Sequence, residues 1–397
     1  MQLLFQTTPY PDETIESYLL RLSQDNGYLG FADMADILWD WLVTQDHELE
    51  GAFPNELQSV DVYKASQSSN FRVRALRLVA QLAGVEAFEL LNLCWLRSNT
   101  QFGAITAVSR DGLLVPRQLL RKSGIPICTE CLKQDAHIPY FWHLRAYKAC
   151  HKHNQQLTRT CGHCDAEIDY RASEAFLECE CGAAIKPAAK ANQADLKLAN
   201  ALAINALAGN AVAKLVGLLA WFSQLQSISY DEDEFSELFV RYFSNWPSSF
   251  EGELNKTAEL AKVKQLRPFN HTPFNDVFGN LLKDSKLACA GSQGYNMVQL
   301  AVITFLTKLV EQNPKKKHPN LGDLLLSMLD AAVILGTNTE QVFRLYEEGF
   351  LAVAQQPKKN TFLKPSDNVF YLRQVIELQQ SFAPNMPNNQ QQFVPPW

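Results

Sequence analysis

The chain has 397 residues, of which 47% are hydrophobic and 20% are charged, and its formal net charge is -6. This composition is typical of a globular protein with a substantial core, and the length allows two or three domains. The acidic balance excludes a protein that coats nucleic acid with a uniformly basic surface. Any contact with DNA or RNA must therefore come from local patches.

The sequence indicates neither a secretion signal nor a membrane span. The first residues, "MQLLFQTTPYPDETIES", lack the basic region and the long apolar core of a signal peptide. The most apolar segment, residues 196–225, is interrupted by Asn200, Asn205, Asn210 and Lys214, and polar side chains are costly in a bilayer. We therefore expect a cytoplasmic protein, in which clustered cysteines bind metal more often than they form disulfides.

Helical periodicity dominates the chain from its start. In residues 12–25, Ile15, Leu19 and Leu22 share one face, Asp12 or Thr14 is the expected cap, and "NGY" is a suitable end. Further helices are expected at 31–42, 71–97, 195–225, 234–243, 297–311, 321–348 and 366–382. Strand signals are confined to residues near 102–108, 166–171 and 175–179. The sequence therefore predicts a mainly α fold with one small irregular module in the middle.

Cysteines and one histidine form four ordered pairs in the middle of the chain. Seven of the nine cysteines fall between residues 128 and 181, in C-x-x-C, C-x-x-H, C-x-x-C and C-x-C pairs. Four pairs supply the ligands of two tetrahedral zinc sites, one Cys₃His and one Cys₄. The alternative is a set of buried or disulfide-bonded cysteines. The predicted ligands are Cys128, Cys131, Cys150, His153, Cys161, Cys164, Cys179 and Cys181.

The spacing of these pairs also indicates what the metal does. A two-residue spacer lets one tight turn aim both side chains at one ion, which favours His153 over His151 and turns His163 outward. Complete sets of four ligands leave no open position for a substrate, and no histidine lies in an H-E-x-x-H or H-x-E pattern. We therefore expect two structural zinc ions. Cys94 and Cys289 lie in apolar helical context and are expected in the core.

Two segments have the spacing of a helix-turn-helix, in which a small residue, a turn glycine and an aliphatic residue follow at fixed intervals. They are residues 330–351, with Ala332, Gly336 and Val342, and residues 71–97, with Ala80, Gly84 and Leu90. A plain pair of helices joined by a glycine turn is the alternative for both. The second helix of the later segment, "TEQVFRLYEE", has one arginine against three glutamates, so we expect it to contact protein rather than to read DNA.

Basic residues gather in three places, each of which is either a solvated face or a weak nucleic-acid contact. They are Arg72, Arg74 and Arg77, then Lys315 to Lys317, and then Lys358, Lys359 and Lys364. No phosphate-binding loop, dinucleotide fingerprint or nucleophile elbow is present, so we expect no enzyme. The predicted domains are an N-terminal helical region (1–115), a double zinc module (116–190), a second helical region (191–320), a helix-turn-helix-like domain (321–383) and a flexible tail (384–397).

Three stretches resemble a known family. The opening "PYPDETIESYLLRLSQDNGY" and the block "CTECLKQDAHIPYFWHLRAYKACHKHNQQLTRTCGHC" resemble TniQ/TnsD-family proteins. The stretch "FSNWPSSF" (243–250), the length and the C-terminal helix-turn-helix are similar to the TniQ subgroup of type I-F CRISPR-associated transposons.

The resemblance implies a non-enzymatic adaptor that selects transposition targets. Such a protein is expected to form a head-to-tail homodimer on the RNA-guided Cascade complex, near the 3′ end of the guide RNA, and to recruit the AAA+ transposition regulator. Base pairing then supplies the sequence specificity, and contact with DNA is mostly indirect. Two alternatives remain: a TnsD-like protein that reads a DNA attachment site directly, and a metal-dependent nuclease, for which no local motif is present.

Overall fold

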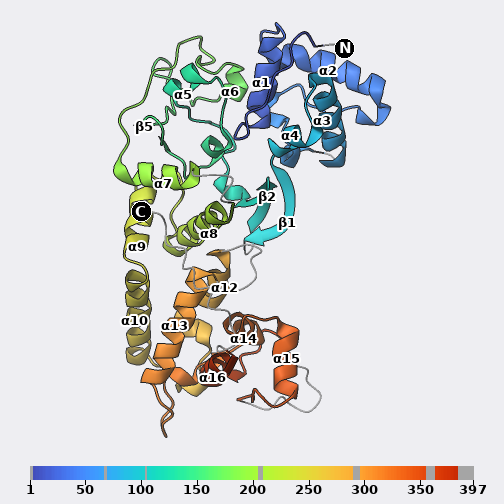
Figure 1. Ribbon diagram of the computed structural model, residues 1–397. Helices are drawn as coiled ribbons and strands as arrows, with labels where there is room; N and C mark the ends of the chain where they lie inside the picture. The colour runs from blue at the N-terminus through green and yellow to red at the C-terminus, as the bar shows by residue number, and fades with distance from the viewer. Residues whose placement is uncertain are drawn as a thin grey trace. The chain divides into compact units, whose positions relative to one another are not determined.

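The computed structural model describes residues 3–66, 69–102, 105–203, 209–288, 296–354 and 363–382. These residues form mainly helices with a few short strands, which confirms the mainly α part of the predicted fold class (Figure 1). The described residues divide into two compact units: one lies within residues 1–216 and 223–240, and the other within residues 217–222 and 241–382. Within the described residues, no helix combines the length and the apolar character needed to cross a bilayer.

The first unit begins with four helices. The hydroxyl of Thr14, one of the two predicted caps, accepts a hydrogen bond from Ser17 N and starts the first helix. Short 3₁₀ helices η1 (His47–Leu49), η2 (Leu57–Ser59) and η3 (Val62–Lys64) connect the second helix to the third. The four helices are α1 (Ile15–Asp25), α2 (Phe31–Gln45), α3 (Ser69–Ala83) and α4 (Ala87–Asn92).

A three-stranded antiparallel sheet follows these helices in the order β1-β2-β3. Its strands are β1 (Leu96–Phe102), β2 (Ile105–Arg110) and β3 (Leu113–Pro116), and η4 (Arg117–Leu119) follows. The helix predicted to reach residue 97 ends at Asn92, and the region 1–115 is not wholly helical. The reason is that burial along β1 alternates every second residue, which is the period of a strand.

The central module has little regular structure. It contains α5 (Thr129–Gln134), η5 (Tyr140–His143), β4 (Ala149–Cys150), β5 (Gln155–Gln156) and α6 (Tyr170–Ser173). The strands predicted at 166–171 and 175–179 are wrong, because these segments carry only the isolated bridges Thr160↔Glu167 and Glu178↔Ala184. Each bridge joins the two ends of a tight turn that contains a pair of cysteines. Such a short turn does not allow further paired residues on either side.

Three further helices lead toward the second unit. They are α7 (Gln193–Ala203), α8 (Gly209–Gln226) and α9 (Phe235–Ser244). The predicted helix 195–225 corresponds to α7 and α8, with residues 204–208 outside the described residues. Asn205, one of the polar residues that interrupt this apolar segment, therefore lies outside the described residues.

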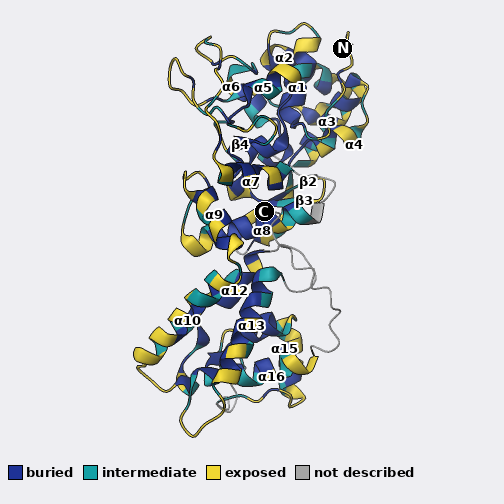
Figure 2. Cartoon of the chain, turned by 60° about the vertical axis from the view of Figure 1, so that its left-hand side comes forward, coloured by how far each residue is buried: buried dark blue, intermediate teal, exposed yellow. Residues whose placement is uncertain are grey.

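The second unit is built from helices and one short strand pair. β6 and β7 pair through Leu325↔Tyr371 and Leu326↔Phe370, so the helices predicted at 321–348 and 366–382 begin later than expected. Many apolar residues of these helices are buried, and buried residues are dark blue in Figure 2. The elements are α10 (Ser248–Val263), η7 (Phe269–His271), α11 (Phe274–Phe278), α12 (Leu281–Ser285), η8 (Lys286–Ala288), α13 (Met297–Gln312), η9 (Leu321–Asp323), β6 (Leu325–Leu326), α14 (Met328–Leu335), α15 (Thr339–Glu347), β7 (Phe370–Tyr371) and α16 (Leu372–Phe382).

Candidate metal centres

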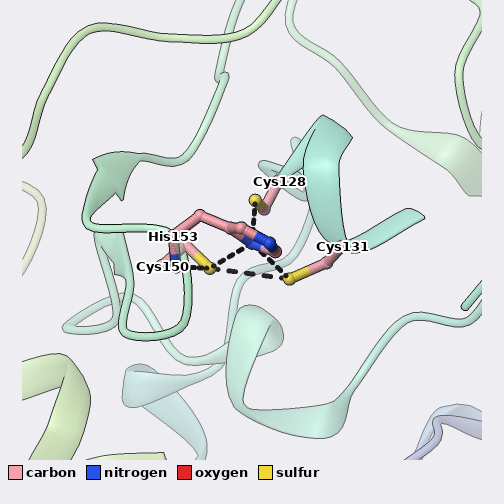
Figure 3. A group of neighbouring side chains, drawn as sticks. All are labelled: Cys128, Cys131, Cys150 and His153. Atoms are coloured by element: carbon pink, nitrogen blue, oxygen red, sulfur yellow. Dashed lines mark hydrogen bonds between the residues drawn. The ribbon is translucent and has the colours of Figure 1, made fainter. Parts of the chain in front are cut away.

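The first cluster contains Cys128, Cys131, Cys150 and His153, whose ligand atoms lie within 4.8 Å of one another (Figure 3). Cys128 is the N-cap residue of α5 and Cys131 lies one turn into that helix. Cys150 ends β4, and His153 lies in the turn between β4 and β5. One short helix and one tight hairpin thus supply two candidate ligands each, which is the arrangement that the paired spacing predicts.

The distances in this cluster are those of ligands around a single tetrahedral ion. His153 Nδ1 lies 3.5, 3.3 and 3.5 Å from the sulfurs of Cys128, Cys131 and Cys150, and the Cys131 and Cys150 sulfurs are 3.5 Å apart. A tetrahedral zinc ion, with bonds of about 2.3 Å to sulfur and about 2.0 Å to nitrogen, separates its ligands by about 3.5–3.8 Å. A disulfide would need a sulfur–sulfur distance of about 2.05 Å.

The second cluster contains Cys161, Cys164, Cys179 and Cys181. The Cys161 and Cys181 sulfurs are 3.8 Å apart, and those of Cys164 and Cys179 are 3.7 Å apart. These distances also fit a tetrahedral ion held by four sulfurs. Gly182 follows the C-x-C pair with a φ of 76°, so glycine is what lets the chain turn back at once.

Hydrogen bonds to sulfur lower the pKa of one thiol in each cluster, Cys128 and Cys161, and raise that of Cys131. The amides of Cys164 and His163 lower the pKa of the Cys161 thiol to about 6. In the first cluster, hydrogen bonds from Cys131 and Cys150 lower the pKa of Cys128, while hydrogen bonding to Cys128 raises that of Cys131. Without an ion the thiols therefore share protons, and a cation would take the place of those protons.

Neighbouring histidines do not belong to either set of four. His151 Nδ1 lies 2.7 Å from the Tyr147 hydroxyl, which explains why His153 rather than His151 faces the thiols. His163 Nδ1 is 3.9 Å from the Cys181 sulfur, at the edge of the second cluster. Cys94 is buried, as predicted, whereas Cys289 lies outside the described residues.

The central module holds the start of α1 through a buried polar network that the sequence did not reveal. Thr14 N donates to Ile138 O, and the Ser17 hydroxyl accepts from Ile138 N at 2.9 Å. The Tyr170 hydroxyl lies 3.0 Å from Thr14 Oγ1 and 3.2 Å from His143 Nε2. Burial, and then the nearby Arg171, hold the pKa of His143 well below its usual value, so this histidine is neutral. Residues around 14 and residues around 140 and 170 therefore form one packed body.

A protein-family model matches much of this packed body. Residues 4–157 match the TniQ family model. The match covers less than half of the 397 residues, and it spans α1–α4, the three-stranded sheet and the whole first cluster. It ends before Cys161, so the second cluster lies outside it. No curated protein matches the chain. This match supports the resemblance to the TniQ family.

A buried group of charges lies inside the same unit as the TniQ match. Arg171 is fully enclosed and donates to Asp169 at 2.7 Å, and its Nη1 lies 4.0 Å from Glu16 Oε1. Lys64 Nζ lies 3.6 Å from the same carboxylate oxygen. Burial, and then the charge of Glu16, raise the pKa of the enclosed Asp61 carboxyl. These groups lie between α1 and α6, and they fix the TniQ segment to the part of the module that follows it.

The basic residues that the sequence suggested as nucleic-acid contacts have different environments. Arg72 is only 5% exposed, and its guanidinium donates to the carbonyls of Ala52, Ser59 and Val60, so it is a structural residue and not an open cation. Arg74 pairs with Asp46 and Glu48, and Arg77 is exposed. Lys315 to Lys317 and Lys364 are exposed, while Lys358 and Lys359 lie outside the described residues.

Both segments with the spacing of a helix-turn-helix form two packed helices joined at a glycine. In the later one, Gly336 ends α14 at a φ of 64°, and Ala332 and Val342 are buried between α14 and α15. In the earlier one, inside the TniQ segment, Gly84 has a φ of 71° and Ala80 and Leu90 are buried. A helix-turn-helix and a plain helix pair share this core.

Proposed function

We propose that this chain is a target-selection adaptor for transposition. In this role it binds the RNA-guided Cascade complex as a homodimer in the cytoplasm and recruits the AAA+ transposition regulator, as the type I-F TniQ resemblance implies. The observation that carries the proposal is the TniQ match over residues 4–157, which lies on a single packed body containing the complete first cluster. A TniQ segment points to a transposition-associated target-selection role.

We further propose that both clusters hold structural zinc ions. Eight ligands in two complete sets of four leave no coordination position for a substrate at either cluster. Each set also lies in a segment with little helix or strand, where binding of zinc can replace a missing core by about 10–16 kcal/mol per site. Zinc would therefore stabilise the fold of the module, and the adaptor role requires no catalytic activity.

The later helix pair supports contact with protein better than contact with DNA. The exposed side chains of α15 include Glu340, Arg344 and Glu347, and Phe350 beyond the helix is 61% exposed. A recognition helix approaches phosphates, which one arginine among glutamates does not favour. We assign this pair as a helix-turn-helix-like element that binds a protein partner, and we expect Arg344→Ala to leave DNA association unchanged.

The proposal is tested by purifying the tagged full-length chain from cells that also express a type I-F Cascade, its guide RNA and the AAA+ regulator. The copurified proteins are identified and the bound RNA is sequenced. We expect Cascade subunits with the guide RNA, and we expect Cys150→Ala to abolish transposition while target-DNA binding by Cascade persists. The His151→Ala chain, altered beside the cluster but not in it, is the matched control.

Other outcomes would refute the adaptor reading. If the regulator copurifies without RNA, and the chain alone binds one duplex in a salt-sensitive and sequence-dependent way, the chain reads DNA directly as a TnsD-like protein. If Cys150→Ala also abolishes DNA binding by Cascade, the chain takes part in recognition itself. Divalent-ion-dependent cleavage of DNA by the purified chain would make it a nuclease.

A further inference from the structure

The α2 region of the first unit has an unusual run of charge. Between Arg21 and Lys64 the sequence has nine Asp and Glu residues and no Lys or Arg. Most of these acids are exposed, and three of them, Asp33, Asp36 and Asp40, lie on α2. A long segment with one sign of charge raises the local concentration of groups with the opposite sign.

The three acids share one face of α2 with apolar side chains. The helix buries Phe31, Met34, Ala35, Leu38 and Leu42 against the rest of the unit. The opposite face, at intervals of three and four residues, carries Asp33, Asp36, Ile37, Asp40 and Trp41, and exposed residues are visible along α2 in Figure 2. We call these five residues the α2 face.

Apolar surface on and beside the α2 face is unusually open to solvent. Ile37 is 44% exposed, and Leu29, just before the helix, is 92% exposed. An open hollow of about 360 Å³ lies beside the face and is lined by Asp36, Trp39, Asp40 and Asn55. An apolar side chain of a partner would find room there, with carboxylates on its rim.

The described residues do not neutralise the carboxylates of this face. Among the described residues no ion pair involves Asp33, Asp36 or Asp40, and Asp36 accepts only the Asn55 amide at 2.6 Å. Arg74 instead pairs with Asp46 and Glu48, beyond the end of α2. The negative charge beside Ile37 and Trp41 is therefore available to a partner.

We infer that the α2 face is a docking surface for a segment of another protein that carries lysine or arginine beside aliphatic side chains. Carboxylates flanking an apolar strip are complementary to a basic amphipathic helix, and they repel nucleic-acid phosphates. Charge complementarity would set the orientation, while Leu29, Ile37 and the hollow would bury apolar atoms. This inference goes beyond the adaptor role, because it does not depend on which complex the chain joins.

The test measures binding of a fluorescent two-heptad peptide of leucine and lysine to the full-length zinc-loaded chain by anisotropy. We expect the D33K/D36K/D40K chain to bind about tenfold or more weakly, because attraction becomes repulsion, and to bind the corresponding leucine–glutamate peptide instead. Ile37→Ser should weaken binding of the lysine peptide without changing its salt dependence. The matched control is D233K/E234K/E237K, which reverses three exposed acids elsewhere in the same unit.

Three outcomes would overturn the inference. Equal weakening by the two triple variants means that only the overall charge attracts the peptide. Unchanged binding by the α2 variant excludes the face as the docking site. If the chain self-associates in sedimentation and D33K/D36K/D40K alone abolishes this, the face is occupied by a second copy of the chain. Thermal unfolding of each variant checks that it is folded. If the α2 variant does not fold, the binding of the lysine peptide by Ile37→Ser tests the inference instead.

Discussion

His151 and His153 are two positions apart, yet their rings have different partners. His153 Nδ1 faces three thiols, whereas His151 Nδ1 lies against the Tyr147 hydroxyl. The remaining nitrogen of His153, Nε2, is 3.3 Å from the side-chain nitrogen of Gln134, so an amide in the opposite orientation would accept its proton. The ring is thus oriented from both sides.

This difference predicts the effect of removing either ring. His153→Ala leaves three thiolates in the first cluster, so one of two zinc ions should be released at a chelator concentration at least about tenfold lower than in the unaltered chain. His151→Ala should release both ions as the unaltered chain does. Metal content during a chelator titration measures both. Equal release from the two variants would contradict the assignment of His153.

A second residue-level prediction concerns pH and His143. Burial depresses the pKa of this histidine in the folded chain well below its usual value, which it regains on unfolding. Below about pH 6.5 the unfolded chain therefore binds a proton that the folded chain does not, and the free energy of unfolding falls as pH falls. Each unit below this point removes up to about 1.4 kcal/mol.

Denaturant unfolding at pH 7 and pH 5.5, with zinc present, measures this loss. His143→Gln, which keeps a polar group near the Tyr170 hydroxyl, should lose less stability between these values than the unaltered chain. Acid release of zinc affects both chains, so the difference between them reports on His143. Parallel losses would show that His143 does not titrate differently on folding.

At the level of elements, a glycine at the end of α14 and a glycine inside α10 should respond in opposite ways to replacement by alanine. Gly336 ends α14 at a φ of 64°, a conformation that side chains disfavour, whereas Gly252 lies inside α10 with open space where a Cβ would lie. Gly336→Ala should lower the free energy of unfolding by about 1–2 kcal/mol. Gly252→Ala should raise it by about 0.5–1 kcal/mol, because alanine favours the helix.

Thermal unfolding of the two variants gives opposite shifts of the midpoint if the turn at Gly336 is as described. A destabilised Gly252→Ala chain would contradict the open surroundings of α10. A Gly336→Ala chain with unchanged stability would contradict the left-handed turn on which the packing of α14 and α15 depends.

Sequence patterns predicted some elements and missed others for physical reasons. Periodicity of 3.6 identified α1, α3 and α13, because each buries one continuous stripe. It missed β1, whose side chains alternate in burial but are mostly polar, as in "LRSNTQF". The ligand pairs were evident because short spacers determine which side chains meet. The network of Thr14, Ile138 and Tyr170 was not, since these residues are far apart in the sequence.

For the whole molecule, the position of the ligands predicts a local response to chelation. All eight candidate ligands lie in the first unit, whereas the helices from α10 onward belong to the second. Removal of zinc should expose amides of residues 128–181 and of α1, which binds that module, to hydrogen exchange. The helices of the second unit should remain protected. Equimolar zinc should restore protection, and equal loss in both units would contradict this independence.

The link between α1 and the central module also bears on how the chain is made by the ribosome. The Thr14 and Tyr170 hydroxyls that meet in the native state are 156 positions apart. At about 5–20 residues per second, synthesis of that interval takes roughly 8–30 s. During this time α1 has emerged without the groups that complete its N-terminal end, and its apolar stripe is open to other chains. α1 is therefore synthesised well before the central module but completed only after that module has folded. If both clusters hold zinc as we propose, we expect zinc supplied during translation to shorten the time for which α1 is exposed.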